Sequence, residues 1–190
     1  MNIETDGLPL NPARSAVPPP DFWVRSHIHR IQLGPVLDLA CGSGRHGRLF
    51  LERGLSVHFL DRDLSGVEDL SGSSSARLHC HDLENGTAWP FSAEYFQGIV
   101  VVNYLHRPLL AELAHWLKPG GVLLYKTFAC GNEQYGRPSN PDYLLHKNEL
   151  MDVFGDAMDV VDCRQQMETS PQRVTQHLCA VKPAPGNYNA

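Results

Sequence analysis

The 190-residue sequence lacks the features that mark membrane-spanning, exported or disulfide-stabilised proteins. No apolar run approaches the roughly 18 residues that a membrane helix needs, and the N-terminus has no basic region followed by an apolar stretch. Its five cysteines are odd in number, widely spaced and without a C-x-x-C pair, which argues against a disulfide framework or a zinc ribbon. We therefore expect a cytoplasmic protein with no membrane partner.

Positive charge is also scarce. Sixteen lysines and arginines against 21 acidic residues give a net charge of -5, so the chain has no overall attraction for nucleic acid. Nucleic acid is therefore not an expected partner. Histidine is more plentiful, and His79 and His81 share one face of an expected strand, but a third ligand at a recognisable spacing is missing. No metal site is predicted.

The chain divides into an arm and one domain. Residues 1–20 contain five prolines and little periodic hydrophobicity, which predicts a flexible arm, and residues 21–190 are enough for a single domain. A short helix is expected from Phe22, before an alternation of elements. Strands are expected at 36–40, 56–61, 76–82, 98–104 and 121–128, with helices at 44–53, 63–70, 107–118 and 147–154. The segments DAMDVVDCRQQM and RVTQHLCAVKP then predict two strands with no helix between them. This order predicts an α/β fold, a Rossmann-like doubly wound, mostly parallel seven-stranded sheet with a C-terminal antiparallel β-hairpin.

The first strand ends in a glycine-rich turn, VLDLACGSGRHG, in which Gly42, Gly44 and Gly47 have the spacing G-x-G-x-x-G. Such a turn lets a nucleotide-like ligand approach the backbone, and nicotinamide dinucleotides are the best-known case. The carboxylate of Asp38 would repel a pyrophosphate at short range. It would instead favour the ammonium and sulfonium groups of S-adenosylmethionine.

Three later strands also end in polar residues. In doubly wound sheets the ligand lies beyond the carboxyl ends of the strands, so Asp61, Asp82 and Asn103 should converge near the turn. Asp61 follows Gly42 by 19 residues, where either cofactor would place a carboxylate on its ribose. Asp82 would accept a hydrogen bond from an adenine amino group. The two aspartates are also suited to cap the helices that follow their strands, and both roles can coexist.

The motifs LDLACGSGRHG, HFLDRD, HDLENGTAWPF, VVNYLHRPLL and LKPGG, in this order, resemble those of class I S-adenosylmethionine-dependent methyltransferases over residues 21–182. The segment LYKTFACGNEQYGRPSNPDYLLHKNEL resembles bacterial small-molecule members, including the tellurite-resistance and thiopurine-methyltransferase-like branch. The resemblance implies that Asp38, Gly42 and Gly44 hold the methionyl moiety and Asp61 the ribose. It implies that Asp82 and Leu83 hold the adenine, while Asn103 closes the methionyl end. The full predicted cofactor set is Asp38, Ala40, Gly42, Gly44, His46, Asp61, Arg62, Asp82, Leu83 and Asn103.

The acceptor should approach beyond the fourth strand, where Tyr104 and His106 are candidates for contacting it. The long irregular stretch 129–146 is a candidate lid, with Tyr135 and Arg137 facing the acceptor, although ordinary surface turns would explain the same sequence. Relatives more often carry glutamate where this chain has Lys126. If that side chain faces the acceptor, the charge preference is reversed; if it faces solvent, nothing follows.

The expected function is transfer of a methyl group from S-adenosylmethionine to a small molecule or ion. A protein or nucleic acid acceptor is one alternative, although the fourth strand ends VVNYLH without the N-P-P-Y tetrad and no basic tail is present. An NAD-dependent oxidoreductase and a non-catalytic nucleotide-binding module are alternatives of another class. The sequence predicts no oligomeric state.

Overall fold

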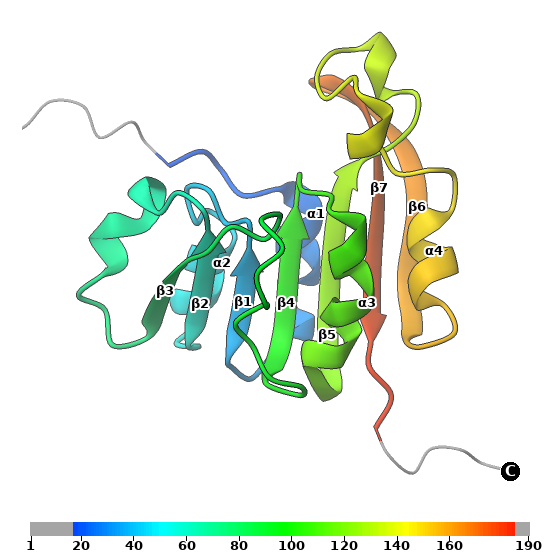
Figure 1. Cartoon of the computed structure of the whole chain (residues 1–190). Helices are drawn as coiled ribbons and strands as arrows, with labels where there is room; N and C mark the ends of the chain where they lie inside the picture. The colour runs from blue at the N-terminus through cyan, green and yellow to red at the C-terminus, as the bar shows by residue number, and fades with distance from the viewer. Residues whose placement is uncertain (1–16, 185–190) are drawn as a thin grey trace, which may run out of the picture.

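A computed structural model describes residues 17–184, and its centre is one seven-stranded sheet in the order β3-β2-β1-β4-β5-β7-β6 (Figure 1). The strands are β1 (Val36–Leu39), β2 (Val57–Asp61), β3 (Ala76–Cys80), β4 (Phe96–Val102), β5 (Leu117–Phe128), β6 (Asp159–Thr169) and β7 (Gln172–Val181). The pairs from β3 across to β5 are parallel, whereas β7 runs antiparallel to both β5 and β6. The predicted fold class, with its C-terminal hairpin, is therefore confirmed.

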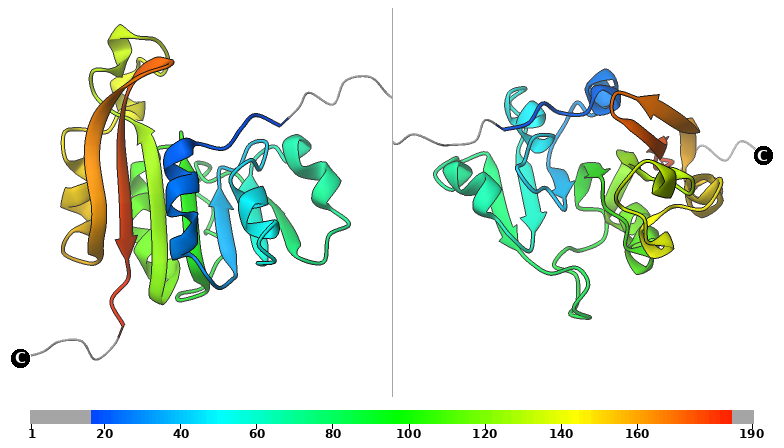
Figure 2. Two further views of the ribbon diagram at one scale, coloured as in Figure 1. Left: turned by 180° about the vertical axis from the view of Figure 1, so that it is seen from behind. Right: turned by 90° about the horizontal axis from the view of Figure 1, so that it is seen from above.

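Helices cover both faces of this sheet. The helices α3 (Arg107–Trp116) and α4 (Glu149–Phe154) lie on one face, and α1 (Phe22–His27) and α2 (Gly47–Leu51) lie on the other (Figures 1 and 2). Short 3-10 helices are η1 (Ile28–Arg30), η2 (Ser65–Leu70), η3 (Asn132–Gln134) and η4 (Pro141–Tyr143). Each face has its own apolar core, around Trp116 and Leu113 on the α3 side and around Phe50 and Phe59 on the α2 side. None of the helices in residues 17–184 is long and apolar enough to cross a bilayer.

The main departures from the expected elements follow the first and second strands. The helix expected at 44–53 is reduced to α2, because the glycine turn takes up the residues before Gly47. The helix expected at 63–70 is the 3-10 helix η2. Most of the predicted proline-rich arm lies outside the described residues.

The carboxyl ends of the parallel strands meet along the upper edge of the sheet in Figure 1. Strand order reverses between β1 and β4, which makes the crevice above these two strands the usual ligand position in a doubly wound sheet. Residues 17–21 and the loop at 129–148 also reach this edge (Figure 1). The topology therefore brings segments from both halves of the chain to one place.

Candidate functional site

The glycine turn after β1 is held in one shape by its neighbours. Gly42 has φ +52°, and its N–H donates to Asp61 Oδ2 at 2.8 Å. A side chain on Gly44 would place its Cβ 2.5 Å from Cγ1 of Val67. Gly44 is therefore needed for packing as well as for its φ of +68°, whereas a Cβ on Gly42 would meet open space. The turn thus leaves open space beside Gly42 and packs Gly44 against the core; a contact of Gly42 or Gly44 with a methionyl group remains a prediction.

Asp38 supports this turn from beneath. Its side chain is 2% exposed, and Oδ2 accepts a hydrogen bond from the Gly47 N–H at 2.7 Å. Burial raises the pKa of the Asp38 carboxyl to about 7. Because Leu37 and Leu39 face the α3 side, Asp38 points to the α2 side of the sheet. Its contact with a methionyl group remains a prediction.

A cavity of about 340 Å³ lies over the carboxyl ends of β1, β2, β3 and β4; we call it the adenosyl cavity. It is lined by Ala40, Asp61, Arg62, His81, Asp82, Leu83, Glu84, Tyr104 and Tyr143. Six of these, namely Ala40, Asp61, Arg62, Asp82, Leu83 and Tyr104, are in the predicted site. Sequence reasoning missed His81, Glu84 and Tyr143.

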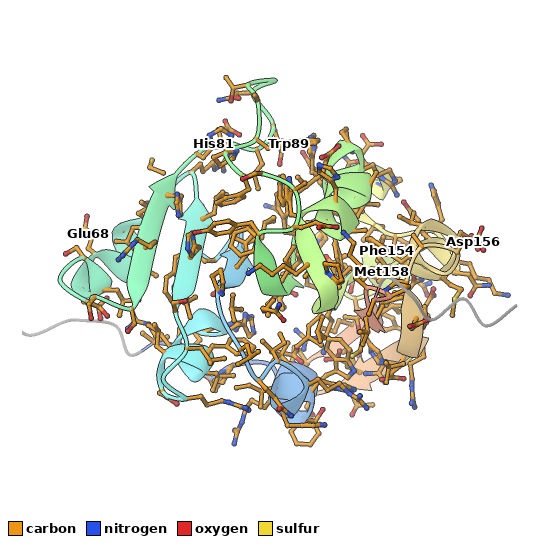
Figure 3. All side chains as sticks on the ribbon, turned by 90° about the horizontal axis from the view of Figure 1, so that it is seen from below. Glu68, His81, Trp89, Phe154, Asp156 and Met158 are labelled. Carbon is orange, nitrogen blue, oxygen red and sulfur yellow. The ribbon has the colours of Figure 1, made fainter. Side chains whose placement is uncertain are left out.

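The carboxylates in this cavity are positioned by local backbone. Asp61 accepts from the N–H of Gly42 through Oδ2 and from the N–H of Asp63 through Oδ1, the latter at 3.1 Å. Asp82 Oδ1 accepts from the Glu84 N–H at 2.9 Å, which fixes the backbone that carries the Glu84 side chain. Neither aspartate caps a helix: η2 has Leu64 at its N-cap without a side-chain hydrogen bond, no helix follows β3 before β4 in residues 17–184, and both carboxylates stabilise turns instead. The loop between His81 and Trp89 projects away from the sheet in Figure 3.

Two buried polar atoms in the cavity wall have no hydrogen-bond partner among the described residues: Tyr104 Oη and His81 Nε2. Burial, followed by the nearby Glu84 carboxylate, raises the pKa of the Tyr104 hydroxyl far above its ordinary value. Buried polar groups are nearly always satisfied, so orphaned ones at a cavity call for a ligand or water. A nucleoside, with its amino, ring-nitrogen and hydroxyl groups, has the chemistry to satisfy them.

A second cavity of about 220 Å³ adjoins the first; we call it the acceptor cavity. It is lined by Glu84, Asn103, Tyr104, Leu105, Thr127, Phe128, Pro138 and Tyr143. Three of these residues, Glu84, Tyr104 and Tyr143, line both cavities. Asn103 has φ +59°, an unusual conformation for a residue other than glycine, and its N–H donates to the Lys126 carbonyl at 2.9 Å. The backbone thus turns sharply where the two cavities meet.

Tyr143 reaches both cavities because Arg107 holds the backbone on either side of it. The Arg107 guanidinium donates to the Asp142 carbonyl at 2.8 Å and to the Leu144 carbonyl at 2.9 Å. It also pairs with the Glu149 carboxylate at 2.8 Å. This contact ties the loop to the start of α3. No local sequence pattern signals it, because the partners lie 35 to 42 residues apart.

The predicted acceptor contacts in the loop lie elsewhere. The Tyr135 hydroxyl donates to Met167 Sδ at 3.9 Å, on β6, and Tyr135 does not line either cavity. Arg137 lines an outer hollow of about 450 Å³ that shares Pro138 and Tyr143 with the acceptor cavity. The structure therefore brings Arg137 near the acceptor cavity but places Tyr143, rather than Tyr135, in its wall.

Two other predicted residues, both histidines, also lie apart from the two cavities. His46 is 4% exposed, and its Nε2 accepts from the Asp21 N–H at 3.2 Å, away from the adenosyl cavity. Burial lowers the pKa of His46 to about 4, so the ring is neutral near pH 7. His106 lines another hollow beside Trp89 and Pro108, which shares Leu83 and Glu84 with the adenosyl cavity. Their contacts with cofactor and acceptor remain predictions.

Lys126 faces neither the acceptor nor solvent. It is 3% exposed, and Nζ lies 2.7 Å from Asp21 Oδ2 and 2.8 Å from Glu168 Oε1. Arg173 completes this group, which we call the ion cluster, with Nη2 at 3.5 Å from Asp21 Oδ2 and Nε at 2.6 Å from Glu168. Burial opposes ionisation, yet the hydrogen bond from Lys126 keeps the pKa values of Asp21 and Glu168 below their usual range. The cluster lies on the α1 side of the sheet.

Known proteins resemble this chain in sequence and in fold. A family model described as a methyltransferase domain matches residues 36–121. A malonyl-[acyl-carrier protein] O-methyltransferase from Salmonella typhimurium is 33% identical over 106 residues, which are 53% of this chain and 41% of that protein. The chain spans about two fifths of the length of the curated relatives it matches. The matched family range contains Glu84 and Tyr104 but not Tyr143.

Solved structures match a larger share of the chain. An S-adenosylmethionine-dependent methyltransferase from Methanosarcina mazei has a TM-score of 0.62 at 17% identity, covering 83% of this chain and 97% of that one. A Burkholderia thailandensis 1,6-didemethyltoxoflavin-N1-methyltransferase, solved with its acceptor and S-adenosylhomocysteine, has a TM-score of 0.63 at 18% identity, with 85% and 75% covered. At these identities the likeness shows the fold, which hosts many reactions.

Proposed function

We propose that this chain, which has the class I S-adenosylmethionine-dependent methyltransferase fold and matches a methyltransferase domain over residues 36–121, transfers a methyl group from S-adenosylmethionine to a small molecule. The observation that carries the proposal is the pair of adjoining cavities at the strand-order reversal. One cavity has the carboxylates and orphaned polar atoms that suit an adenosyl group. The other is smaller and opens from the same wall.

The charge of the adenosyl cavity favours this ligand over a dinucleotide. Asp61, Asp82 and Glu84 line it against a single cation, Arg62. A pyrophosphate would meet three carboxylates at short range, which is unfavourable in a partly enclosed site. A ligand with a ribose, an adenine and a positively charged sulfur has no such conflict. Asp61 would hold the ribose hydroxyls, and Asp82 with Leu83 would hold the adenine.

The protein's contribution to methyl transfer is alignment and exclusion of water. S-adenosylmethionine supplies an electrophilic methyl group on sulfur, and the reaction needs the acceptor atom in line with it. Tyr104 and Tyr143 form the shared wall of both cavities, so they can orient the two substrates toward each other. Leu105 and Phe128 make the acceptor side apolar, which disfavours water.

The size of the acceptor cavity supports a compact acceptor. Its 220 Å³ is below the roughly 300 to 1,000 Å³ that pockets for drug-sized ligands occupy. A polymer would need an extended surface, and a net charge of -5 gives the chain no overall attraction for a nucleic acid. A free small molecule fits this site better than a protein side chain or a nucleic acid base.

Calorimetry with S-adenosylhomocysteine and with NADH tests the proposal. We expect S-adenosylhomocysteine to bind and NADH to give no heat of binding. Transfer of labelled methyl groups to a panel of thiols, tellurite, phenols and amines would then separate an enzyme from a non-catalytic module. Binding of NADH without S-adenosylhomocysteine would contradict the proposal.

A further inference from the structure

The acceptor cavity has a distinctive charge. Of the residues that line it, Glu84 is the one that carries a charge, and the others are apolar or neutral. Glu84 also lines the adenosyl cavity, so this solvent-exposed residue borders both spaces. The hydrogen bond from its own N–H to Asp82 fixes where this side chain starts.

The positive groups of the surrounding elements do not line this cavity. Arg107 pairs with Glu149 and with two loop carbonyls, and Lys126 is buried in the ion cluster on the other side of the sheet. Arg62 lines the adenosyl cavity, and Arg137 lines the outer hollow. In the described part of the chain, the acceptor cavity therefore has no cation in its wall.

This distribution of charge discriminates between acceptors. A carboxylate in the cavity would lose part of its hydration and face the exposed Glu84 carboxylate without a counter-charge in the cavity wall, which is unfavourable. An amine would exchange its hydration for the Glu84 carboxylate. The Tyr104 hydroxyl, whose pKa is raised by burial and then by Glu84, lies next to it and could contact a polar group on the same molecule.

We propose, building on the methyltransferase function proposed above, that the acceptor is a compact, largely apolar molecule that presents an amine or another basic nitrogen to Glu84, and that Glu84 determines this specificity. This preference differs from that named for the curated relatives, which are called malonyl-[acyl-carrier protein] O-methyltransferases. Glu84 would contact the acceptor directly.

The chemistry balances without a further reactant. An ammonium group paired with Glu84 first gives one proton to the Glu84 carboxylate or to water, which frees the nitrogen lone pair. The lone pair then forms the new N–C bond as the S–C bond breaks, and the electron pair of that bond stays on sulfur, which becomes a neutral thioether. The product is the N-methylated ammonium, which keeps its remaining protons or releases one to water. A hydrogen bond from N–H to Glu84 would orient the lone pair before transfer.

Methyl transfer to matched probes tests the assignment. Phenethylamine and phenylacetate have similar size and opposite charge. The amine panel would also contain compact primary, secondary and ring amines, and the carboxylate panel other compact carboxylates. We expect labelled methyl transfer to amines and none to carboxylates. In Glu84→Gln the KM for the amine should rise about 10- to 100-fold, because a charge-assisted hydrogen bond is lost.

Two further measurements distinguish a failure of the Glu84 assignment from a failure of the proposed methyltransferase function. Affinity for S-adenosylhomocysteine should fall by a smaller factor in Glu84→Gln than the KM for the amine rises, because the ribose and adenine contacts are assigned to Asp61 and Asp82. The matched control is Glu133→Gln, at an exposed position outside both cavities. A protein that binds S-adenosylhomocysteine but methylates carboxylates, or methylates no amine, overturns the Glu84 assignment alone. A protein that does not bind S-adenosylhomocysteine overturns the proposed function itself.

Discussion

The ion cluster and the adenosyl cavity lie on opposite sides of the same sheet edge, and both are rich in charge. In the ion cluster, Lys126 lies within hydrogen-bonding distance of two carboxylates, and Arg173 reaches both of them. In the adenosyl cavity three carboxylates share one arginine, and two buried polar atoms have no partner in residues 17–184. Buried charges that pair with one another need no ligand, whereas unpartnered buried polar atoms beside a cavity are suited to bind one. The comparison therefore predicts a structural role for the ion cluster and a binding role for the adenosyl cavity.

The largest expected effect comes from breaking the ion cluster. Lys126→Met leaves Asp21 and Glu168 buried without their main cation, which should lower the free energy of unfolding by about 3 to 5 kcal/mol. Urea denaturation measures this change. The matched control is Lys147→Met, at an exposed position, where a change within about 0.5 kcal/mol is expected. Equal free energies of unfolding for the two variants would show that the ion cluster does not stabilise the fold.

Asp38, on the α2 side of the sheet beneath the glycine turn, should give a pH-dependent effect. Burial raises its pKa in the folded state to about 7, well above 3.8, so the folded protein holds this proton where the unfolded chain has lost it. Stability should therefore fall as pH rises from about 4 to about 7, by roughly 1.4 kcal/mol per pH unit from this group. His46, with its lowered pKa, gives the opposite slope below pH 6.5. Subtracting the pH profile of Asp38→Asn from that of the wild type isolates Asp38, and a flat difference would contradict the assignment.

In the cavity, removing one carboxylate should weaken binding rather than folding. Asp61→Asn should reduce affinity for S-adenosylhomocysteine by about 1 to 3 kcal/mol, because a charge-assisted hydrogen bond to the ribose becomes a neutral one. Asparagine keeps one oxygen for the N–H groups of Gly42 and Asp63, so the turn should largely persist. Calorimetry measures the affinity, with Asp156→Asn as the exposed control. An affinity loss matched by that control would remove Asp61 from the site.

Much of the cavity follows from the order of elements. Asp61 and Asp82 come at or just after strands whose apolar pattern is plain in the sequence, and the carboxyl ends of parallel strands meet at one edge. Once the strands are predicted, these side chains must lie near the glycine turn. Glu84 lies only two residues after Asp82 and was not predicted, because the loop that contains it has no periodic pattern to indicate where its side chain lies.

The ion cluster and Tyr143 depend on contacts that no local pattern encodes. Lys126 and Asp21 are 105 residues apart, and a charged residue in a buried strand does not indicate which segment will pair with it. Tyr143 is placed by Arg107, whose long side chain reaches carbonyls rather than a complementary side chain. Every residue has a backbone carbonyl, so a contact to one requires no particular residue type and cannot be predicted from the sequence.

The smallest expected effect concerns backbone strain, which also lies on the cavity side. Ala40 and Asn103 follow the adjacent strands β1 and β4, and both have positive φ, at 53° and 59°. Ala40→Gly should raise the free energy of unfolding by about 0.5 to 1 kcal/mol, because relief of the left-handed strain exceeds the entropy cost of glycine. Urea denaturation measures it against Ala114→Gly within α3, where the same change should lower stability by about 1 kcal/mol. Changes of opposite sign in the free energy of unfolding of the two variants would show that the backbone at Ala40 is strained, as it often is in functional sites. A loss at both would mean that the Ala40 methyl group, which packs against the α3-side core, contributes more than the strain costs.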